Sequence, residues 1–226
     1  MERTAIVTGG TGGLGAAVTR RLLDDGWRVV VPWYAERELA RVDAHERLDL
    51  VQADLTDPAS AESAVAAAGD GLGALVNLVG GFAQGERVHA TPVDEFERML
   101  RLNLRPTYLM CAAALEPMLA AGKGAIVCVS ARAALQPFPG AAGYITAKAA
   151  VLAFVDVLHE EYRADGIRAN AIMPSTIDTP ANRSSQPDGD FARWVKPAEI
   201  AVVVAHLCSD DTSVTSGGHI PVYGRA

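Results

Sequence analysis

A tyrosine and a lysine four residues apart carry the clearest chemistry in this sequence. Tyr144 and Lys148 lie in a segment whose apolar residues have helical spacing, so their side chains project one turn apart from the same helix face. A phenol with a pKa of about 10 is a poor acid–base catalyst at neutral pH unless a nearby cation stabilises the phenolate. Because Lys148 supplies such a cation, the pair predicts general acid–base catalysis by Tyr144. An ordinary helix with an exposed tyrosine and lysine is the alternative.

A glycine-rich turn near the start of the chain predicts a nucleotide site. Gly9, Gly13 and Gly15 fall between an apolar run at residues 5–7 and a segment with helical spacing at residues 16–25. A strand that turns sharply into a helix while its backbone lies against a pyrophosphate needs residues without a Cβ. The helix then directs unpaired N–H groups and its positive dipole end at the phosphates. A tight turn with no ligand is the alternative.

Short apolar runs rich in β-branched residues alternate with helical segments along the whole chain. Such runs are typical of strands buried on both faces, and parallel neighbours need helical crossovers. The sequence therefore predicts an α/β fold, a doubly wound Rossmann-type parallel sheet of about seven strands with helices on both faces. Residues 1–226 form one domain, and we interpret the polar segment 175–193 as a substrate lid. The expected strands lie at residues 5–7, 29–31, 50–51, 75–79, 126–129, 169–172 and 220–222.

Composition argues against several classes of partner. The chain of 226 residues has a formal net charge of -7 and no basic block, so nucleic acid is not an expected partner. No apolar run approaches the roughly 20 residues of a membrane helix and no signal segment opens the chain, so we expect a cytoplasmic protein that does not bind membranes. Three widely spaced cysteines among apolar neighbours predict buried thiols in a reducing compartment, with no disulfide and no metal site.

Together these motifs resemble the short-chain dehydrogenase/reductase family over essentially the whole chain. The glycines at 9, 13 and 15, followed far downstream by Tyr144 and Lys148, carry the resemblance. It implies an NAD(P)-dependent oxidoreductase that moves hydride between a nicotinamide and a small-molecule carbonyl or alcohol, with Lys148 also holding the nicotinamide ribose. The cofactor-binding residues that it implies are Gly9, Thr11, Gly13, Leu14, Gly15, Trp33, Arg37, Asp54, Leu55, Asn77, Gly80, Tyr144, Lys148, Pro174, Ile177 and Thr179.

Three further segments match the family's cofactor motifs to different degrees. Asp54 matches the acid that contacts the adenine. Residues 77–80 are a divergent form of the Asn-Asn-Ala-Gly motif, and residues 174–179 resemble the Pro-Gly-x-x-x-Thr segment whose threonine holds the nicotinamide carboxamide. Each has a cap or turn residue as its alternative, but their order along the chain supports the resemblance.

The choice between NAD and NADP depends on the end of the second strand. Trp33 stands where an acid would accept a hydrogen bond from the ribose of NAD. Gly12 stands where NADP-dependent members of the family carry a base, yet Arg37 is within reach of a 2′-phosphate. We therefore expect NADP or NAD, with Arg37 favouring NADP.

Two polar residues complete the catalytic group that the resemblance implies. Asn103 matches the family's asparagine that bends a helix and holds a water of the proton relay, with a structural polar contact as the alternative. The family's serine normally lies thirteen positions before the tyrosine, where this chain has Ala131, whereas Ser130 lies fourteen before. Either the loop at residues 132–143 carries one extra residue and Ser130 donates to the substrate oxygen, or the serine is absent and Tyr144 acts alone.

Local likenesses leave the function within this class open. Segments 131–135, 177–183 and 190–194 look like those of dihydropteridine reductases, family members that keep the tyrosine and lysine but lack the serine. The alternatives to a general carbonyl reductase are such an enzyme, or a nucleotide-binding scaffold without turnover. The helices expected at 96–119 and 143–162 carry more apolar positions than one sheet face needs. With the family's habit of subunit contacts, they predict a homo-oligomer, either a dimer or a tetramer.

Overall fold

The protein is built around one parallel sheet. A computed structural model describes residues 3–225. The strands are β1 (Thr4–Thr8), β2 (Arg28–Trp33), β3 (Leu48–Gln52), β4 (Leu72–Asn77), β5 (Gly124–Val129), β6 (Ile167–Pro174) and β7 (His219–Val222). They lie in the order β3-β2-β1-β4-β5-β6-β7, and all neighbours are parallel. The strand order reverses between β1 and β4, and an open α/β sheet holds its ligand at such a point.

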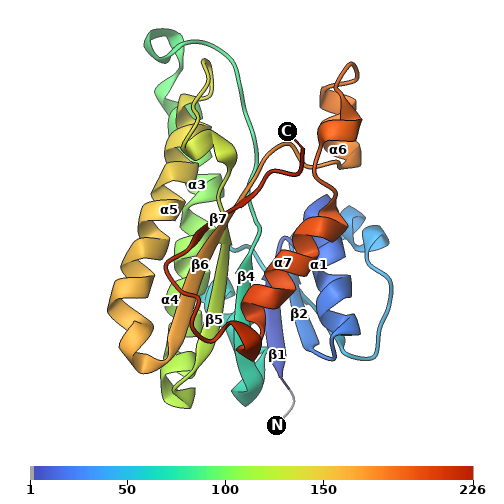
Figure 1. The fold of residues 1–226 in the computed structure, drawn as a ribbon, viewed down its shortest axis with the longest axis vertical. Coiled ribbons are helices and arrows are strands. Elements are labelled where there is room, and N and C mark those ends of the chain that lie inside the picture. Colours follow the sequence, from blue (N-terminus) through green and yellow to red (C-terminus); the bar gives the residue numbers. More distant parts are fainter. Residues whose placement is uncertain (1–2, 226) are drawn as a thin grey trace.

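Helices cover both faces of this sheet (Figure 1). They are α1 (Gly13–Asp24), α2 (Pro58–Ala66), α3 (Val93–Asn103), α4 (Arg105–Ala121), α5 (Ala142–Tyr162), α6 (Pro180–Ser185) and α7 (Pro197–Cys208). Helices α2, α4 and α5 pack on one face, with α3 beside α5, whereas α1 and α7 pack together on the other. The predicted doubly wound sheet with helices on both faces is therefore confirmed.

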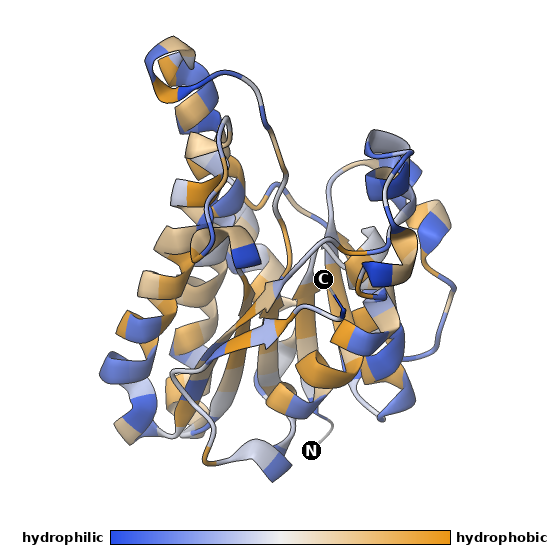
Figure 2. Cartoon of the chain, turned by 45° about the horizontal axis from the view of Figure 1, so that its top comes forward, coloured by the Kyte–Doolittle hydropathy of each residue, from blue (hydrophilic) through white to orange (hydrophobic). Residues whose placement is uncertain are grey.

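Two apolar cores, one on each face, hold these layers together. Strand residues alternate between the cores, because successive side chains of a strand point to opposite faces. Ile6 and Leu75 face α2, α4 and α5, whereas Val7 and Val76 face α1 and α7. Figure 2 shows hydrophobic residues along the strands and hydrophilic residues on the outer turns of the helices. Each such side chain stabilises the fold by about 1.5–3 kcal/mol on burial.

The helix predicted at residues 96–119 is two helices. Helix α3 ends at Asn103, and α4 begins at Arg105. Pro106 lies in the first turn of α4 and has no N–H group to donate to the carbonyl of Leu102, so it favours a helix start at this point. The break leaves the buried Asn103 at a helix end, where its side chain is available for contacts outside the helix.

The segment predicted as a loose lid, residues 175–193, contains ordered elements. It includes α6 and a short helix at Phe191–Arg193. Arg183 donates to Asp178 at 2.8 Å, and its guanidinium lies over the ring of Phe191, 4.6 Å from the centroid. Ile177 also pairs with Val195 in an isolated bridge. The segment is thus a small folded cap after β6, and its role as a lid stays a prediction.

Helix α5 is unusually apolar for its length. Among residues 3–225 it is the one helix long and apolar enough to cross a membrane, whereas no apolar run of that length is expected from the sequence. Val151, Val155 and Leu158 of this helix are buried in the core against the sheet. That packing accounts for the apolar residues on the sheet-facing side of the helix.

Candidate active site

The turn between β1 and α1 has the geometry of a phosphate-binding loop. The N-cap of α1 is Gly12, so no side chain caps the helix and the N–H groups of its first turn lack a side-chain partner. A Cβ added at Gly15 would lie 1.9 Å from the carbonyl oxygen of Gly9, so only glycine fits there. The N–H groups and the positive end of the helix are therefore available to a pyrophosphate, and these residues fit a dinucleotide cofactor.

The glycine loop contacts two other segments of the site. Thr8 Oγ1 accepts hydrogen bonds from the N–H groups of Leu78 (3.1 Å) and Val79 (3.4 Å), which holds the end of β4 against the end of β1. A Cβ at Gly13 would lie 2.8 Å from the methyl carbon of Thr179, so the segment after β6 approaches the loop closely. The structure thus brings the predicted glycines and Thr179 together, and it adds Thr8, which sequence reasoning missed.

The adenosine end of this site contains a carboxylate that sequence reasoning also missed. Glu38, in the short helix Glu36–Arg41 after β2, accepts a hydrogen bond from Thr11 Oγ1 at 2.9 Å. The side chain of Arg37 is exposed and forms no hydrogen bond within residues 3–225, and Trp33 ends β2 half-buried. An acid about 20 residues after a glycine motif is a known signal for a ribose contact, and it could have identified Glu38.

The other predicted cofactor residues differ in where their side chains lie. Asp54 Oδ1 accepts from the N–H (2.9 Å) and Oγ1 (2.7 Å) of Thr56, and these hydrogen bonds hold the pKa of Asp54 below its usual value. Asn77 turns its side chain into the core, where Nδ2 donates to Cys111 Sγ at 3.3 Å. The structure therefore does not bring the Asn77 side chain to the cofactor site. The remaining positions follow or end β3, β4 and β6: Leu55, Gly80, Pro174 and Ile177.

Tyr144 and Lys148 lie near the start of α5, as the sequence predicted. Lys148 is 5% exposed, its Nζ donates to the carbonyl of Val129 at 3.1 Å, and Nζ lies 6.0 Å from the centroid of the Tyr144 ring. Burial lowers the pKa of Lys148 to about 8 and raises the pKa of Tyr144 to about 12. At neutral pH the phenol is therefore protonated, and the lysine beside it is mostly cationic.

Gly80 lies between Asn103 and Lys148. A Cβ at Gly80 would be 2.6 Å from Asn103 Oδ1 and 3.2 Å from Lys148 Nζ, so a larger residue would displace both. Asn103 Oδ1 accepts from the N–H of Gly81 (3.1 Å), while Nδ2 donates to the carbonyls of Gly81 (3.0 Å) and Met99 (3.0 Å). The structure thus groups Asn103 with Lys148, and it ties the end of α3 to the turn after β4.

Ser130 directs its hydroxyl at the backbone of α5. Its Oγ donates to the carbonyl of Lys148 at 2.7 Å, and the residue is buried. Ala131, thirteen positions before Tyr144, is also buried and has extended backbone angles. Of the two arrangements that the sequence left open, this geometry favours the one in which the substrate-binding serine is absent.

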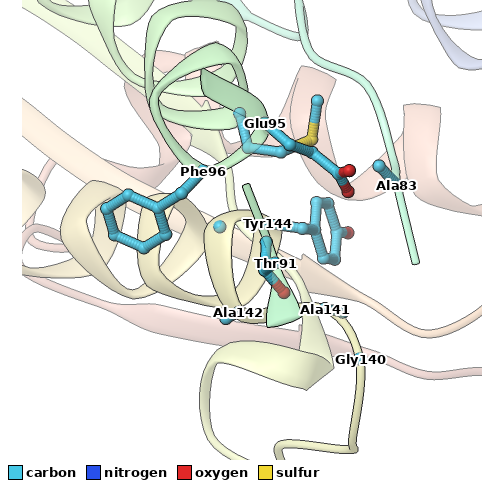
Figure 3. Close-up of a pocket in the computed structure, with 10 residues that line it drawn as sticks. Ala83, Thr91, Glu95, Phe96, Gly140, Ala141, Ala142 and Tyr144 are labelled. Carbon is cyan, nitrogen blue, oxygen red and sulfur yellow. The ribbon is translucent and has the colours of Figure 1, made fainter. Parts of the chain in front are cut away.

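Aromatic rings lie on one side of Tyr144. The ring of Phe82 meets that of Tyr144 edge to face at 5.0 Å between centroids, and Phe138 lies 6.3 Å from Phe82. Figure 3 shows a small pocket beside the phenol, lined by Thr91 and Glu95 among others. Its volume of about 10 Å³ is enough for roughly one water molecule and too small for a substrate. This pocket is therefore not a substrate site.

Comparisons with known proteins identify the family of this chain. The short chain dehydrogenase family matches residues 3–190. The chain is 36% identical over 245 residues to 2-(R)-hydroxypropyl-CoM dehydrogenase of Xanthobacter autotrophicus, covering 99% of this chain and 98% of that protein. It is 34% identical over 247 residues to 4-formylbenzenesulfonate dehydrogenase of Comamonas testosteroni, covering 99% and 97%.

A solved structure supports the same assignment. An oxidoreductase of the short chain dehydrogenase/reductase family from Burkholderia thailandensis superposes with a TM-score of 0.90 at 30% sequence identity, covering 99% of this chain and 92% of that one. The chain belongs to the short-chain dehydrogenase family and is an NAD(P)-dependent oxidoreductase.

Proposed function

We propose that this protein interconverts a small-molecule carbonyl compound and its alcohol, with Tyr144 as the acid–base catalyst. The observation that carries the proposal is the buried Lys148 ammonium next to the Tyr144 phenol, 6.0 Å from Nζ to the ring centroid. A scaffold that only binds a nucleotide could use Lys148 to hold the ribose, but it has no need for a phenol beside that buried cation. The names of two relatives, a hydroxypropyl and a formyl compound, agree with chemistry at a hydroxyl-bearing or carbonyl carbon.

The proton moves between Tyr144 Oη and the substrate oxygen. When bound, the nicotinamide supplies hydride to the carbonyl carbon, or takes it from the alcohol carbon. In the reducing direction, the phenol of Tyr144 gives its proton to the oxygen as negative charge develops there, so that C=O becomes CH–OH. Lys148 then stabilises the phenolate that remains, because a cation next to a phenolate lowers the pKa of the phenol. Asn103 positions Lys148 through the close packing of both residues on Gly80.

Ser130 positions α5 in this mechanism and does not contact the substrate. Its one donor is used by the carbonyl of Lys148, which fixes the distance between the end of β5 and α5. Substrate polarisation then rests on Tyr144 alone. A catalytic group without the serine is also the one expected for the dihydropteridine-reductase-like alternative. That likeness concerns the mechanism and does not identify the substrate.

Glu38 bears on the cofactor preference. A carboxylate hydrogen-bonded to Thr11 would accept from the ribose hydroxyls of NAD and would repel the 2′-phosphate of NADP. Arg37, the residue before Glu38, has an exposed side chain that is free to turn towards a phosphate. We expect both cofactors to bind, with Glu38 opposing the preference for NADP that Arg37 suggests.

The exposed face of α4 and α5 supports the predicted homo-oligomer. A groove there is lined mainly by apolar and aromatic residues, Leu104, Tyr108, Ala150 and Phe154 among them, together with Arg101 and Arg105, and the rings of Tyr108 and Phe154 lie 5.8 Å apart. A second copy of the chain would cover it. Sedimentation of the wild type and of Tyr108→Glu should show an oligomer that dissociates in the variant, whereas a monomeric wild type would contradict this expectation.

A direct assay tests the proposed reaction. The purified protein is given NADH or NADPH with a panel of ketones and aldehydes, and both cofactor absorbance and alcohol product are measured. We expect at least one carbonyl compound to be reduced, with one cofactor consumed per alcohol formed. Tight cofactor binding without consumption by any member of a broad panel would favour the scaffold instead.

A further inference from the structure

Arginine side chains gather around the C-terminal segment, residues 223–225, which directly follows β7. The guanidinium of Arg132 lies over the ring of Tyr223, 5.1 Å from the centroid. The Nε of Arg193 donates to the carbonyl of Arg225 at 3.5 Å. These contacts join three parts of the chain, the loop after β5, the cap after β6 and the C-terminal segment.

This cluster lies at the same edge of the sheet as Tyr144. Arg132 follows the end of β5 by three residues, and β5, β6 and β7 are parallel neighbours. Ser175, just after β6, donates to the carbonyl of Tyr223 at 2.7 Å, which fixes the C-terminal segment over the carboxyl ends of these strands. Figure 1 shows the C-terminal end between α6 and the ends of α3 and α5. Arg132 therefore borders the space between the catalytic tyrosine and the cap.

The charge of Arg132 is not neutralised within the described residues. Its Nε donates to the neutral Gln136 side chain at 2.7 Å, while its two Nη atoms have no hydrogen-bond partner among residues 3–225. Arg183 of the cap differs, because Asp178 pairs with it. A guanidinium held by an aromatic ring and a neutral amide, with its planar fork free, is suited to bind a carboxylate or another oxyanion in two places at once.

The surface next to this cation is apolar and aromatic. Phe82 is 57% exposed although its ring packs against Tyr144, and Phe138, whose ring lies beside Phe82, is 37% exposed. Leu135, on the same loop as Arg132, is 56% exposed. The Gly85 N–H donates to the carbonyl of Gly140 at 2.8 Å, and this hydrogen bond holds the two loops that carry the phenylalanines together. Exposed apolar side chains beside a polar anchor are typical of a small-molecule site.

We infer that the substrate is an apolar or aromatic carbonyl compound that carries an oxyanion, such as a carboxylate, and that Arg132 binds this group. The body of the substrate lies against Phe82 and Phe138, and the anion lies at the end remote from the reacting carbon. The inference rests on the proposed function for the position of the carbonyl at Tyr144. The position of the anion and of the apolar body rests on the free Nη atoms of Arg132 and on the exposed aromatic rings, and these observations do not depend on the proposed reaction.

A pair of isosteric aldehydes tests this inference. The value of kcat/KM is measured for 4-formylbenzoate, which is anionic, and for 4-formylbenzamide, which is neutral. The variants are Arg132→Gln, Arg132→Lys and a control, Arg163→Gln, whose residue is exposed near the far end of α5. At 1.5 Å rise per residue it lies about 28 Å along the helix from Tyr144. Calorimetric binding of benzoate and benzamide to the cofactor-loaded protein is measured in parallel, since these two compounds cannot react.

We expect the wild type to prefer the anionic aldehyde by about ten- to a hundredfold, the usual worth of a hydrogen bond to a charged group. Arg132→Gln should abolish that preference, Arg132→Lys should keep part of it, and Arg163→Gln should leave it unchanged. Benzoate binding should follow the same order. If Arg132→Gln folds poorly, the loss of two-point binding in Arg132→Lys is the readout.

Failure of this inference is distinguishable from failure of the proposed function. Turnover of both aldehydes with no preference that depends on Arg132, and no such dependence in benzoate binding, overturns the inference and leaves the reaction intact. Binding of benzoate that depends on Arg132 without turnover of any aldehyde supports the anion site and contradicts the proposed reaction.

Discussion

Removal of the Ser130 hydroxyl separates the two catalytic arrangements that the sequence left open. In Ser130→Ala the lost donor is the one that now reaches the carbonyl of Lys148 at 2.7 Å. The residue is 2% exposed, so no water can replace the hydroxyl without rearrangement. The carbonyl of Lys148 keeps its ordinary helical partner four residues on, because α5 continues to Tyr162. The change therefore removes one buried hydrogen bond and leaves no unpaired acceptor.

The two arrangements predict different magnitudes. One net hydrogen bond contributes about 1 kcal/mol, so Tm should fall by about 2–4 °C in a chain of this size. Since the hydroxyl does not contact substrate, kcat should fall less than about tenfold. A donor aimed at a developing oxyanion would instead lower kcat by about a hundredfold or more.

Thermal melts and steady-state kinetics on the same preparations measure both effects. Thr212→Val serves as a control far along the chain from the site, because this buried hydroxyl lies 2.9 Å from the carbonyls of His206 and Ser209 and accepts from Arg168 Nη1 at 3.1 Å. It should lower Tm with no change in kcat. A loss of about a hundredfold in kcat for Ser130→Ala, with Tm unchanged, would refute the positioning role.

Three further changes probe the cation, the cofactor preference and the packing of the site. Burial lowers the pKa of Lys148 from 10.5 to about 8, so between these values the unfolded lysine binds more protons than the folded one, and its contribution to stability rises with pH. Burial raises the pKa of the Cys208 thiol to about 12, which acts in the opposite sense, so the quantity to measure is the difference in stability between the wild type and Lys148→Met. Denaturation curves should show the wild type gaining stability relative to the variant as pH rises across this window, and an unchanged difference would contradict the lowered pKa of Lys148. Glu38→Gln removes the negative charge next to Thr11, so fluorescence titration should show NADPH binding about tenfold more tightly and NADH binding little changed. An unaltered ratio of the two Kd values would exclude Glu38 as a determinant of cofactor preference. Gly80→Ala places a Cβ 3.2 Å from Lys148 Nζ, so it should reduce kcat by more than about tenfold and destabilise the protein by about 1–3 kcal/mol. A variant with the kcat and the free energy of unfolding of the wild type would contradict the packing described.

The architecture could be predicted from the sequence because its signals are local. Each β-branched apolar run became a strand, and the glycine turn lies between β1 and α1 where the motif placed it. The break between α3 and α4 was missed although its cause, Pro106, is also local; the apolar pattern that continues through it was given too much weight.

Parts of the site depend on contacts that spacing does not encode. The hydrogen bond between Thr11 and Glu38 joins residues 27 positions apart, and it depends on the path of the short helix after β2. For Ser130, counting fixes the position along the chain, whereas the pleat at the end of β5 decides which way the hydroxyl points. Asn77 matched a cofactor motif by position, yet its side chain faces two core thiols.

The central claim is that Tyr144 exchanges a proton with the substrate oxygen, and Tyr144→Phe tests it most directly. The variant keeps the ring that packs against Phe82, so the fold and the cofactor site should be preserved. The measurement is the rate of carbonyl-dependent cofactor oxidation together with the Kd for the cofactor on the same sample. We predict that turnover falls by about a hundredfold or more while Kd stays within about twofold. Turnover at the wild-type rate in Tyr144→Phe would contradict the account.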